Sequence, residues 1–177
     1  MTPPLVLGRL DASLPHALRG ENDMPKIDVT TVPVRKGSGY PAPFAAAAGA
    51  RIRQALGNAG GLTDFGVNLT QLPPGAWSSH RHWHSSEDEF VYILSGEVIL
   101  ITDAGEQTLR ANDCAAFPRN IPDGHHLINR GNEIAVYLEI GTRHADDSCS
   151  YPDIDLHVDG DAGYTHKDGT PYADSSG

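Results

Sequence analysis

Three histidines at alternate positions, His80, His82 and His84, are followed by a carboxylate at Glu89 and, much later, by His125. Alternate side chains of a strand point to the same face, so His82 and His84 on one strand can reach one metal ion. His80 would then lie on the same face, one step further out. Three imidazoles and one carboxylate form a ligand set suited to zinc, iron, manganese or nickel. The sequence therefore predicts a site for one divalent metal ion of unspecified identity.

The elements that must position these residues are short strands. Apolar, β-forming runs separated by turn residues fall at 62–72, 77–84, 90–94, 97–102, 107–110, 114–117, 125–129 and 134–140. The 19 glycines and 13 prolines favour such strands and turns over long helices. About eight short strands in succession predict an all-β barrel or jelly roll.

The two ends of the chain have a different texture. Residues 1–23 are expected to be a flexible N-terminal segment, with a conceivable internal start at Met24, and residues 24–61 an N-terminal arm. The arm is expected to hold an edge strand over 26–34 and a short helical turn over 44–50, while 51–56 is ambiguous between helix and strand. Residues 144–177 are expected to be an acidic, solvated C-terminal extension that follows a barrel at 62–143.

Charge and composition limit the partners. The formal net charge of −10 argues against nucleic acid or an anionic membrane surface. An anionic substrate stays possible, because a metal and a local arginine, with Arg119 and Arg143 as candidates, can reverse the sign of charge inside a pocket. No run is long and apolar enough to span a membrane, and the two cysteines are expected to be free thiols, with Cys114 a small buried residue. We therefore expect a cytoplasmic protein with a small-molecule substrate or ligand.

Two motifs carry a resemblance to a known family. The first runs from Gly75 through His82-x-His84 and Glu89 to Gly96, and the second runs from Asp113 through Pro118 to His125-x-x-x-Asn129. Together they resemble the paired motifs of the cupin superfamily over residues 62–142, and the wider texture is similar to small single-domain bacterial cupins. The sequence departs from the usual pattern at Asn112 and Asn120, where glycine is usual. The resemblance implies a cupin-type jelly-roll β-barrel, commonly paired as a homodimer.

The same resemblance selects the ligands from their rivals. Six residues separate Glu89 from Gly96, which favours Glu89 over Glu87 and Asp88 as the carboxylate ligand. The three-residue interval to Asn129 likewise favours His125 over His126, which is expected to lie at the surface or at an interface. The expected metal ligands are His82, His84, Glu89 and His125. His80 is expected to act as a base or substrate contact beside them, although a solvated position at the mouth of the site is an alternative.

The function stays open at this level. One hypothesis is a mononuclear metal-dependent enzyme that acts on a small polar metabolite. Iron would favour dioxygenase chemistry, and zinc, manganese or nickel would favour an isomerase or lyase. The alternative is a non-catalytic small-molecule or metal-binding barrel that acts as a sensor, and a metal-free structural barrel is a third reading.

Overall fold

The computed structural model describes residues 26–42, 44–160 and 163–172, and these residues fold mainly into antiparallel strands. A six-stranded sheet has the order β1 (Val34–Lys36), β2 (Ile52–Ala55), β3 (Phe65–Leu72), β10 (Ala135–Thr142), β5 (Glu89–Ser95) and β8 (Cys114–Phe117). A three-stranded sheet has the order β7 (Gly105–Arg110), β6 (Glu97–Thr102) and β9 (His126–Ile128). A four-stranded sheet has the order β13 (Tyr164–Thr165), β12 (Leu156–Asp159), β11 (Ser148–Tyr151) and β4 (Trp83–His84).

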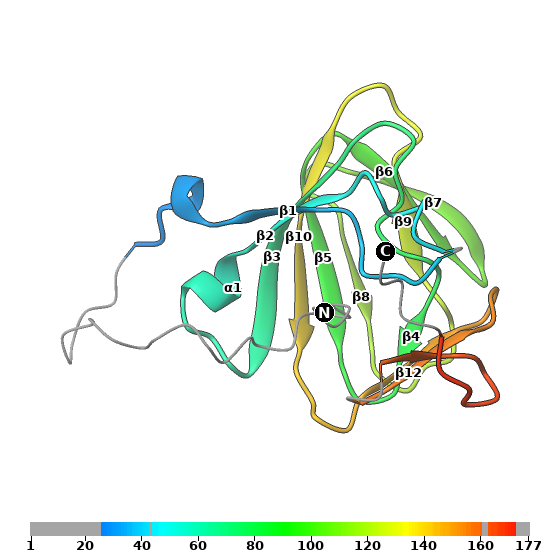
Figure 1. Cartoon of the computed structure of the whole chain (residues 1–177). Helices are drawn as coiled ribbons and strands as arrows, with labels where there is room; N and C mark the ends of the chain where they lie inside the picture. Colours follow the sequence, from blue (N-terminus) through cyan, green and yellow to red (C-terminus); the bar gives the residue numbers. More distant parts are fainter. Residues whose placement is uncertain (1–25, 43, 161–162, 173–177) are drawn as a thin grey trace.

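The two smaller sheets lie opposite the large one, as Figure 1 shows, with β6, β7 and β9 in the upper part of the view and β4 and β12 in the lower part. Alternation of side chains produces this arrangement, because β3 buries every second residue along most of its length. The main core joins side chains from both layers, among them Leu72, Ile93, Val98 and Tyr137. The all-β jelly-roll architecture predicted from the sequence is confirmed.

Most of the predicted strands are present with small changes at their ends. Strands β6 and β8 begin and end at the predicted residues, and β3, β5, β7, β9 and β10 differ only at their termini. The expected strand over 77–84 is much shorter, because only Trp83–His84 forms β4. Trp77 and His82 take part only in isolated bridges. The side-chain alternation that placed His80 beside His82 therefore does not apply here.

The N-terminal arm differs from the expected edge strand over 26–34. It forms a short 3-10 helix, η1 (Val29–Thr31), capped by the Asp28 side chain, which accepts a hydrogen bond from the Thr30 amide at 3.0 Å. The strand β1 begins only at Val34, the last residue of the expected edge strand. The expected helical turn over 44–50 is a series of non-helical turns where it is described, and the ambiguous segment becomes β2, followed by the one-turn helix α1 (Leu56–Ala59). The predictions for residues 1–23 and Met24 lie outside the described residues.

The expectation of a solvated C-terminal extension is wrong for most of its length. Strands β11, β12 and β13 form a sheet, and β11 pairs with β4 beside the predicted ligands. Cys149, Tyr151, Leu156 and Val158 form a second buried cluster there. The pattern is hard to see in the sequence, because the buried positions alternate with polar residues that are half-buried or, at Asp159, exposed.

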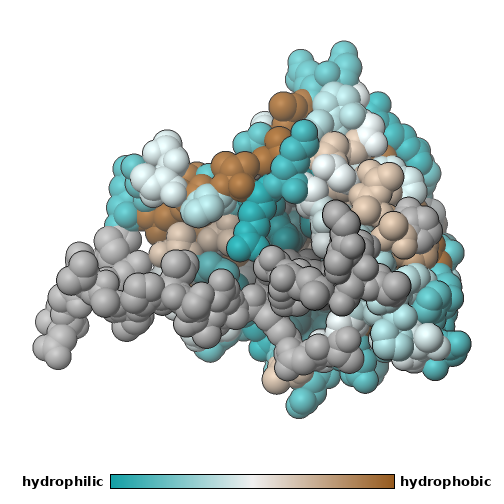
Figure 2. Space-filling view, viewed as in Figure 1, coloured by the Kyte–Doolittle hydropathy of each residue, from teal (hydrophilic) through white to brown (hydrophobic). Residues whose placement is uncertain are grey.

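Two surface properties complete the description. In the space-filling view, hydrophobic residues form a band across the upper left of the molecule, whereas the right side is mainly hydrophilic (Figure 2). Exposed large hydrophobic side chains include Val29, Val34, Leu62 and Phe65. Within the described ranges, no helix has the length and apolar character needed to cross a membrane.

Candidate metal centre

The four predicted ligands come together from separate sheets. His84 belongs to β4 and Glu89 begins β5, while His125 directly precedes β9. His82 is tied to His125 by two backbone hydrogen bonds, from the His82 amide at 3.2 Å and from the His125 amide at 2.9 Å. The pairing of these two short segments therefore places the two halves of the sequence motif side by side.

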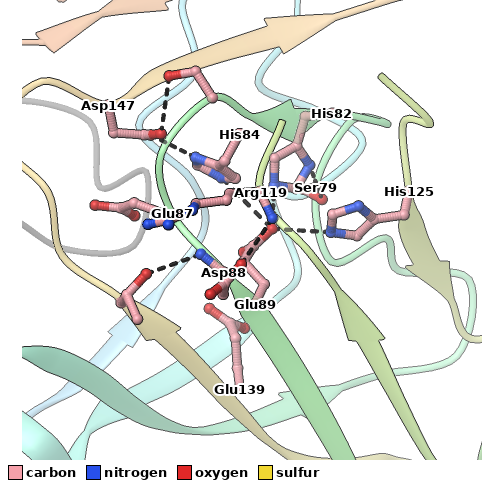
Figure 3. Close-up of polar contacts among 12 residues, drawn as sticks. Ser79, His82, His84, Glu87, Asp88, Glu89, Arg119, His125, Glu139 and Asp147 are labelled. Carbon is pink, nitrogen blue, oxygen red and sulfur yellow. Dashed lines mark hydrogen bonds and ion pairs between the residues drawn. The ribbon is translucent and has the colours of Figure 1, made fainter. Parts of the chain in front are cut away.

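Glu89 is the centre of the group (Figure 3). Its Oε2 atom lies 2.9 Å from His125 Nε2 and 3.6 Å from Nε2 of both His82 and His84. His84 Nε2 is buried and has no hydrogen-bond partner among the described residues, and the buried Glu89 Oε2 has only its ion-pair contacts with the three imidazoles. Buried polar atoms are almost always paired, so the unpaired His84 Nε2 points to a further partner at this position. A divalent metal ion fits this donor set of three imidazole nitrogens and one carboxylate oxygen.

Hydrogen bonds on the far side of two rings fix their orientation. His84 Nδ1 donates to Asp147 Oδ2 at 2.6 Å, and Asp147 also accepts from the Ser86 amide at 2.8 Å. His82 Nδ1 lies 2.9 Å from the carbonyl oxygen of His80, an acceptor only. Each ring therefore keeps Nε2 for the site, as histidine ligands of metals do.

The electrostatics of the metal-free site are those of a tightly coupled cluster. Burial lowers the pKa of His82 to about 3. Burial also opposes the charged form of His84, but Glu89 and Asp147 raise its pKa to about 9. Burial alone would raise the pKa of Glu89, yet the neighbouring histidines, His84 first, hold it well below its usual range. The carboxylate is thus ionised and one imidazole beside it is protonated, and this proton is the one that a metal ion would displace.

Two further residues lie close to these ligands and were not selected from the sequence. Cys149 Sγ lies within 4.8 Å of ligand atoms of His82 and His84, and its residue pairs with His84 across β4 and β11. Burial raises the pKa of the Cys149 thiol well above its usual value. Asp147 comes from the same C-terminal sheet. No local signal in the sequence marks either residue, because both lie in a segment of acidic and polar composition that predicts a solvated extension.

His80 lies elsewhere than the sequence predicted. Its Nε2 is 2.8 Å from the Phe44 carbonyl oxygen, and its ring packs edge-on against Tyr40, Phe44 and Trp77. The His80 side chain therefore anchors the N-terminal arm, and only its backbone carbonyl contacts the predicted ligand His82.

Two other expectations from the sequence are corrected. His126 is buried, with Nδ1 2.9 Å from the Ser79 carbonyl oxygen and its ring edge-on against Trp77, so it is not a surface residue of the chain. Cys114 is exposed rather than buried, while both cysteines are free thiols as expected. Asn129 is fully buried and its amide donates to the carbonyl oxygens of Leu72 and Glu133 at 2.6 and 2.7 Å, so its role is to brace the backbone.

A cavity opens onto the ligands from the large sheet. Its lining includes His82, Glu89 and His125 together with Arg51, Arg53, Glu139 and several tyrosines. The two arginines suggested by the sequence lie elsewhere. Arg119 is exposed, and the Arg143 guanidinium hydrogen-bonds to Asn58 and to the Leu62 carbonyl oxygen. The arginines that line the cavity are Arg53 in β2 and Arg51 directly before it. The sequence pattern of this segment is ambiguous between helix and strand.

Comparisons with known proteins agree with this geometry. Residues 68–141 match the family model described as Cupin domain. The sugar phosphate isomerase from a cupin superfamily of Silicibacter pomeroyi is 43% identical, with a TM-score of 0.80 over 85% of this chain and 98% of that chain. The chain belongs to the cupin superfamily. A cupin of Acidithiobacillus ferrooxidans, provisionally named a sugar phosphate isomerase, is 30% identical, with a TM-score of 0.65 over 73% of this chain and 83% of that one.

A more distant cupin shows the fold alone. A predicted oxalate decarboxylase of Thermotoga maritima is 19% identical, with a TM-score of 0.55 over 68% of this chain and all of that one. A search of curated proteins gave no significant match.

Asn112 and Asn120, which stand where cupins usually have glycine, adopt the left-handed backbone conformation that glycine favours. Asn112 has φ +75° and Asn120 has φ +58°, both in the left-handed region. Asparagine is among the few residues other than glycine that adopt this region readily. The Asn120 amide donates to the His84 carbonyl oxygen at 2.7 Å, so the changed loop is still bound to the strand that carries a ligand.

Proposed function

We propose that this cupin is a mononuclear metal-dependent isomerase that acts on a small polar metabolite, with His82, His84, Glu89 and His125 as the ligands. The observation that carries the proposal is the convergence of three imidazole Nε2 atoms within 2.9 to 3.6 Å of the buried Glu89 Oε2, on a carboxylate that lines a cavity. The likeness to two cupins named as sugar phosphate isomerases favours isomerase over lyase or dioxygenase chemistry.

The residues of the chain would have distinct parts in this function. A divalent ion bound here would supply Lewis-acid polarisation of a carbonyl or hydroxyl oxygen. Asp147 and the His80 carbonyl oxygen hold the two imidazoles of the His82–His84 pair in the orientation that offers Nε2. Phe117 stacks on His125 with ring centroids 3.6 Å apart, which fixes that ring and covers it with an apolar surface. A direct catalytic role for His80 stays a prediction, tested by comparing turnover of a His80→Gln variant with the wild type.

Metal content is the first test. Protein purified without chelators or a metal-affinity tag should contain about one equivalent of a divalent metal by elemental mass spectrometry. The His82→Ala variant should lose that metal, whereas His157→Ala, which changes a histidine of β12 outside the site, should keep it. Metal-free protein that takes up none on reconstitution would contradict the proposal.

Turnover is the second test. The metal-loaded protein should interconvert aldose and ketose forms in a panel of sugar phosphates, followed by nuclear magnetic resonance, and His82→Ala should not. A compound that binds tightly but stays unaltered over long incubation would instead support the alternative, a non-catalytic binding barrel. Oxygen consumption with an iron-loaded sample would support the dioxygenase alternative.

We also propose that the protein is a cytoplasmic homodimer. The exposed β1 edge and the exposed apolar residues Val29 and Val34 near it support pairing, because natural proteins seldom leave such an edge uncovered. Light scattering coupled to gel filtration tests the dimer, and a mass of one chain would contradict it.

A further inference from the structure

Arg51 is a buried cation in the cavity of the metal centre. Its residue is only 8% exposed, and it lies at the start of β2, where its carbonyl accepts a hydrogen bond from the Gly37 amide at 2.8 Å. The guanidinium donates through Nη1 to the Ser78 carbonyl oxygen at 2.5 Å, and its Nε atom is buried without a partner among the described residues. A buried guanidinium is costly unless its charge and its donors are paired.

No carboxylate of the described chain pairs with Arg51. The nearby Glu139 is already engaged, because it accepts from Arg53 at 3.2 Å, from Thr70 at 3.2 Å and from Asn68 at 3.4 Å. Arg53 thus has its counter-ion, and Arg51 has none within ion-pair distance among the described residues. Arg51 is therefore a buried cation of the cavity without an ion-pair partner among the described residues.

A second unpaired donor lines the same cavity. The Tyr137 hydroxyl, on a residue only 1% exposed in the middle of β10, has no hydrogen-bond partner among the described residues. Burial raises the pKa of Tyr137, and the negative charges of Glu139 and Glu89 add to this, so the hydroxyl keeps its proton and can donate. Tyr137, Glu139 and Glu89 all line this cavity.

From this geometry we infer that Arg51 and Tyr137 form a subsite for an oxyanion group, a phosphate or a carboxylate, on the molecule that reaches the metal ligands. An oxyanion would accept from the free guanidinium nitrogen and from the tyrosine hydroxyl, and its charge would balance that of Arg51. This inference rests on the proposed function, because the bound molecule is a substrate only if the protein is an enzyme. It assigns the class of that substrate, which is a small metabolite with an anionic group. The buried guanidinium of Arg51 would let this chain bind an anion even though its formal net charge is −10.

Calorimetric titration of the full-length protein with inorganic phosphate and, separately, with acetate tests the subsite. We expect at least one of the two anions to bind. The anion with the higher affinity shows whether the subsite prefers a phosphate or a carboxylate group. Arg51→Gln should weaken that binding by at least about tenfold, because a charge-assisted hydrogen bond is lost. Arg130→Gln removes an equal charge from an exposed arginine paired with Glu106, and it should leave binding unchanged.

One further variant and a metal-free sample keep the test decisive. Tyr137→Phe removes a hydroxyl that has no protein partner, so it should fold with an unchanged or higher melting temperature and yet weaken anion binding. Wild-type protein from which a chelator has removed the metal should still bind the anion, because the subsite belongs to the protein and not to the ion. Anion binding that is absent in the wild type, unaffected by Arg51→Gln and Tyr137→Phe, or lost when the metal is removed from the wild-type protein would overturn the subsite. A lack of turnover with intact anion binding would contradict the proposed function alone.

Discussion

At the scale of single residues, the site depends on partners that are not ligands themselves. Asp147→Asn keeps the shape of the side chain but removes the charge that accepts from His84 Nδ1 at 2.6 Å. Metal affinity should fall by about 10- to 100-fold, the usual cost of losing such a partner. Competition with a chromophoric chelator measures it. Asp155→Asn is the control, because Asp155, in the turn between β11 and β12, forms a similar 2.7 Å contact with His166 at an exposed position, and it should have no effect.

The protonation of His84 predicts how metal binding depends on pH. Although burial opposes its charge, Glu89 and Asp147 raise the pKa of His84 to about 9, so the metal-free site carries a proton on this ring at neutral pH. A metal ion must displace that proton, and its apparent affinity should therefore rise about tenfold per pH unit between pH 6 and 8, with release of one proton. Chelator competition at several pH values measures this slope. An affinity that stays constant over this range would show that the ring is already neutral.

At the scale of elements, the turn from β5 in the six-stranded sheet to β6 in the three-stranded sheet depends on one glycine. Gly96 has φ +74°, and a Cβ atom there would lie 2.8 Å from Ala135 Cα and 2.9 Å from the Ile134 carbonyl oxygen. Gly96→Ala should destabilise the fold by more than the roughly 1–3 kcal/mol of strain alone, because the backbone of β10 must also move. Urea unfolding measures the loss. Gly61→Ala has a similar φ of +75° with nothing within 4 Å, so it should show strain alone, and equal losses would contradict the steric argument.

The same scale explains what the sequence could and could not reveal. Strands β6 and β8 were predicted to the residue, because apolar β-formers end there at clear turn residues such as Gly96 and Pro118. The segment before His84 looked like a strand but is mostly irregular, since it pairs only through isolated bridges, and so His80 turns toward the N-terminal arm. Arg51 was overlooked because its burial depends on distant contacts that no local pattern encodes.

At the scale of the whole molecule, the ligands join separate sheets. His84 lies in the four-stranded sheet and Glu89 in the six-stranded one, while His125 precedes the edge strand of the three-stranded sheet. A bound metal ion would therefore link all three sheets, and its removal should loosen the sheets relative to one another more than it loosens any single strand pair. Hydrogen exchange of the metal-free and metal-loaded protein should show the largest differences over β4, the start of β5 and the residues before β9.

The same link predicts a gain in global stability. A metal ion that binds only the folded chain stabilises it by about 4 kcal/mol at a thousandfold excess over its dissociation constant. The melting temperature should therefore rise on metal loading and fall again on chelation, and the size of the shift should follow metal concentration. His157→Ala should behave like the wild type, while His82→Ala should melt at a temperature that metal does not change. A shift that persists in His82→Ala would place the stabilising ion somewhere other than these four residues, and the role of this cluster would then have to be sought in its hydrogen bonds alone.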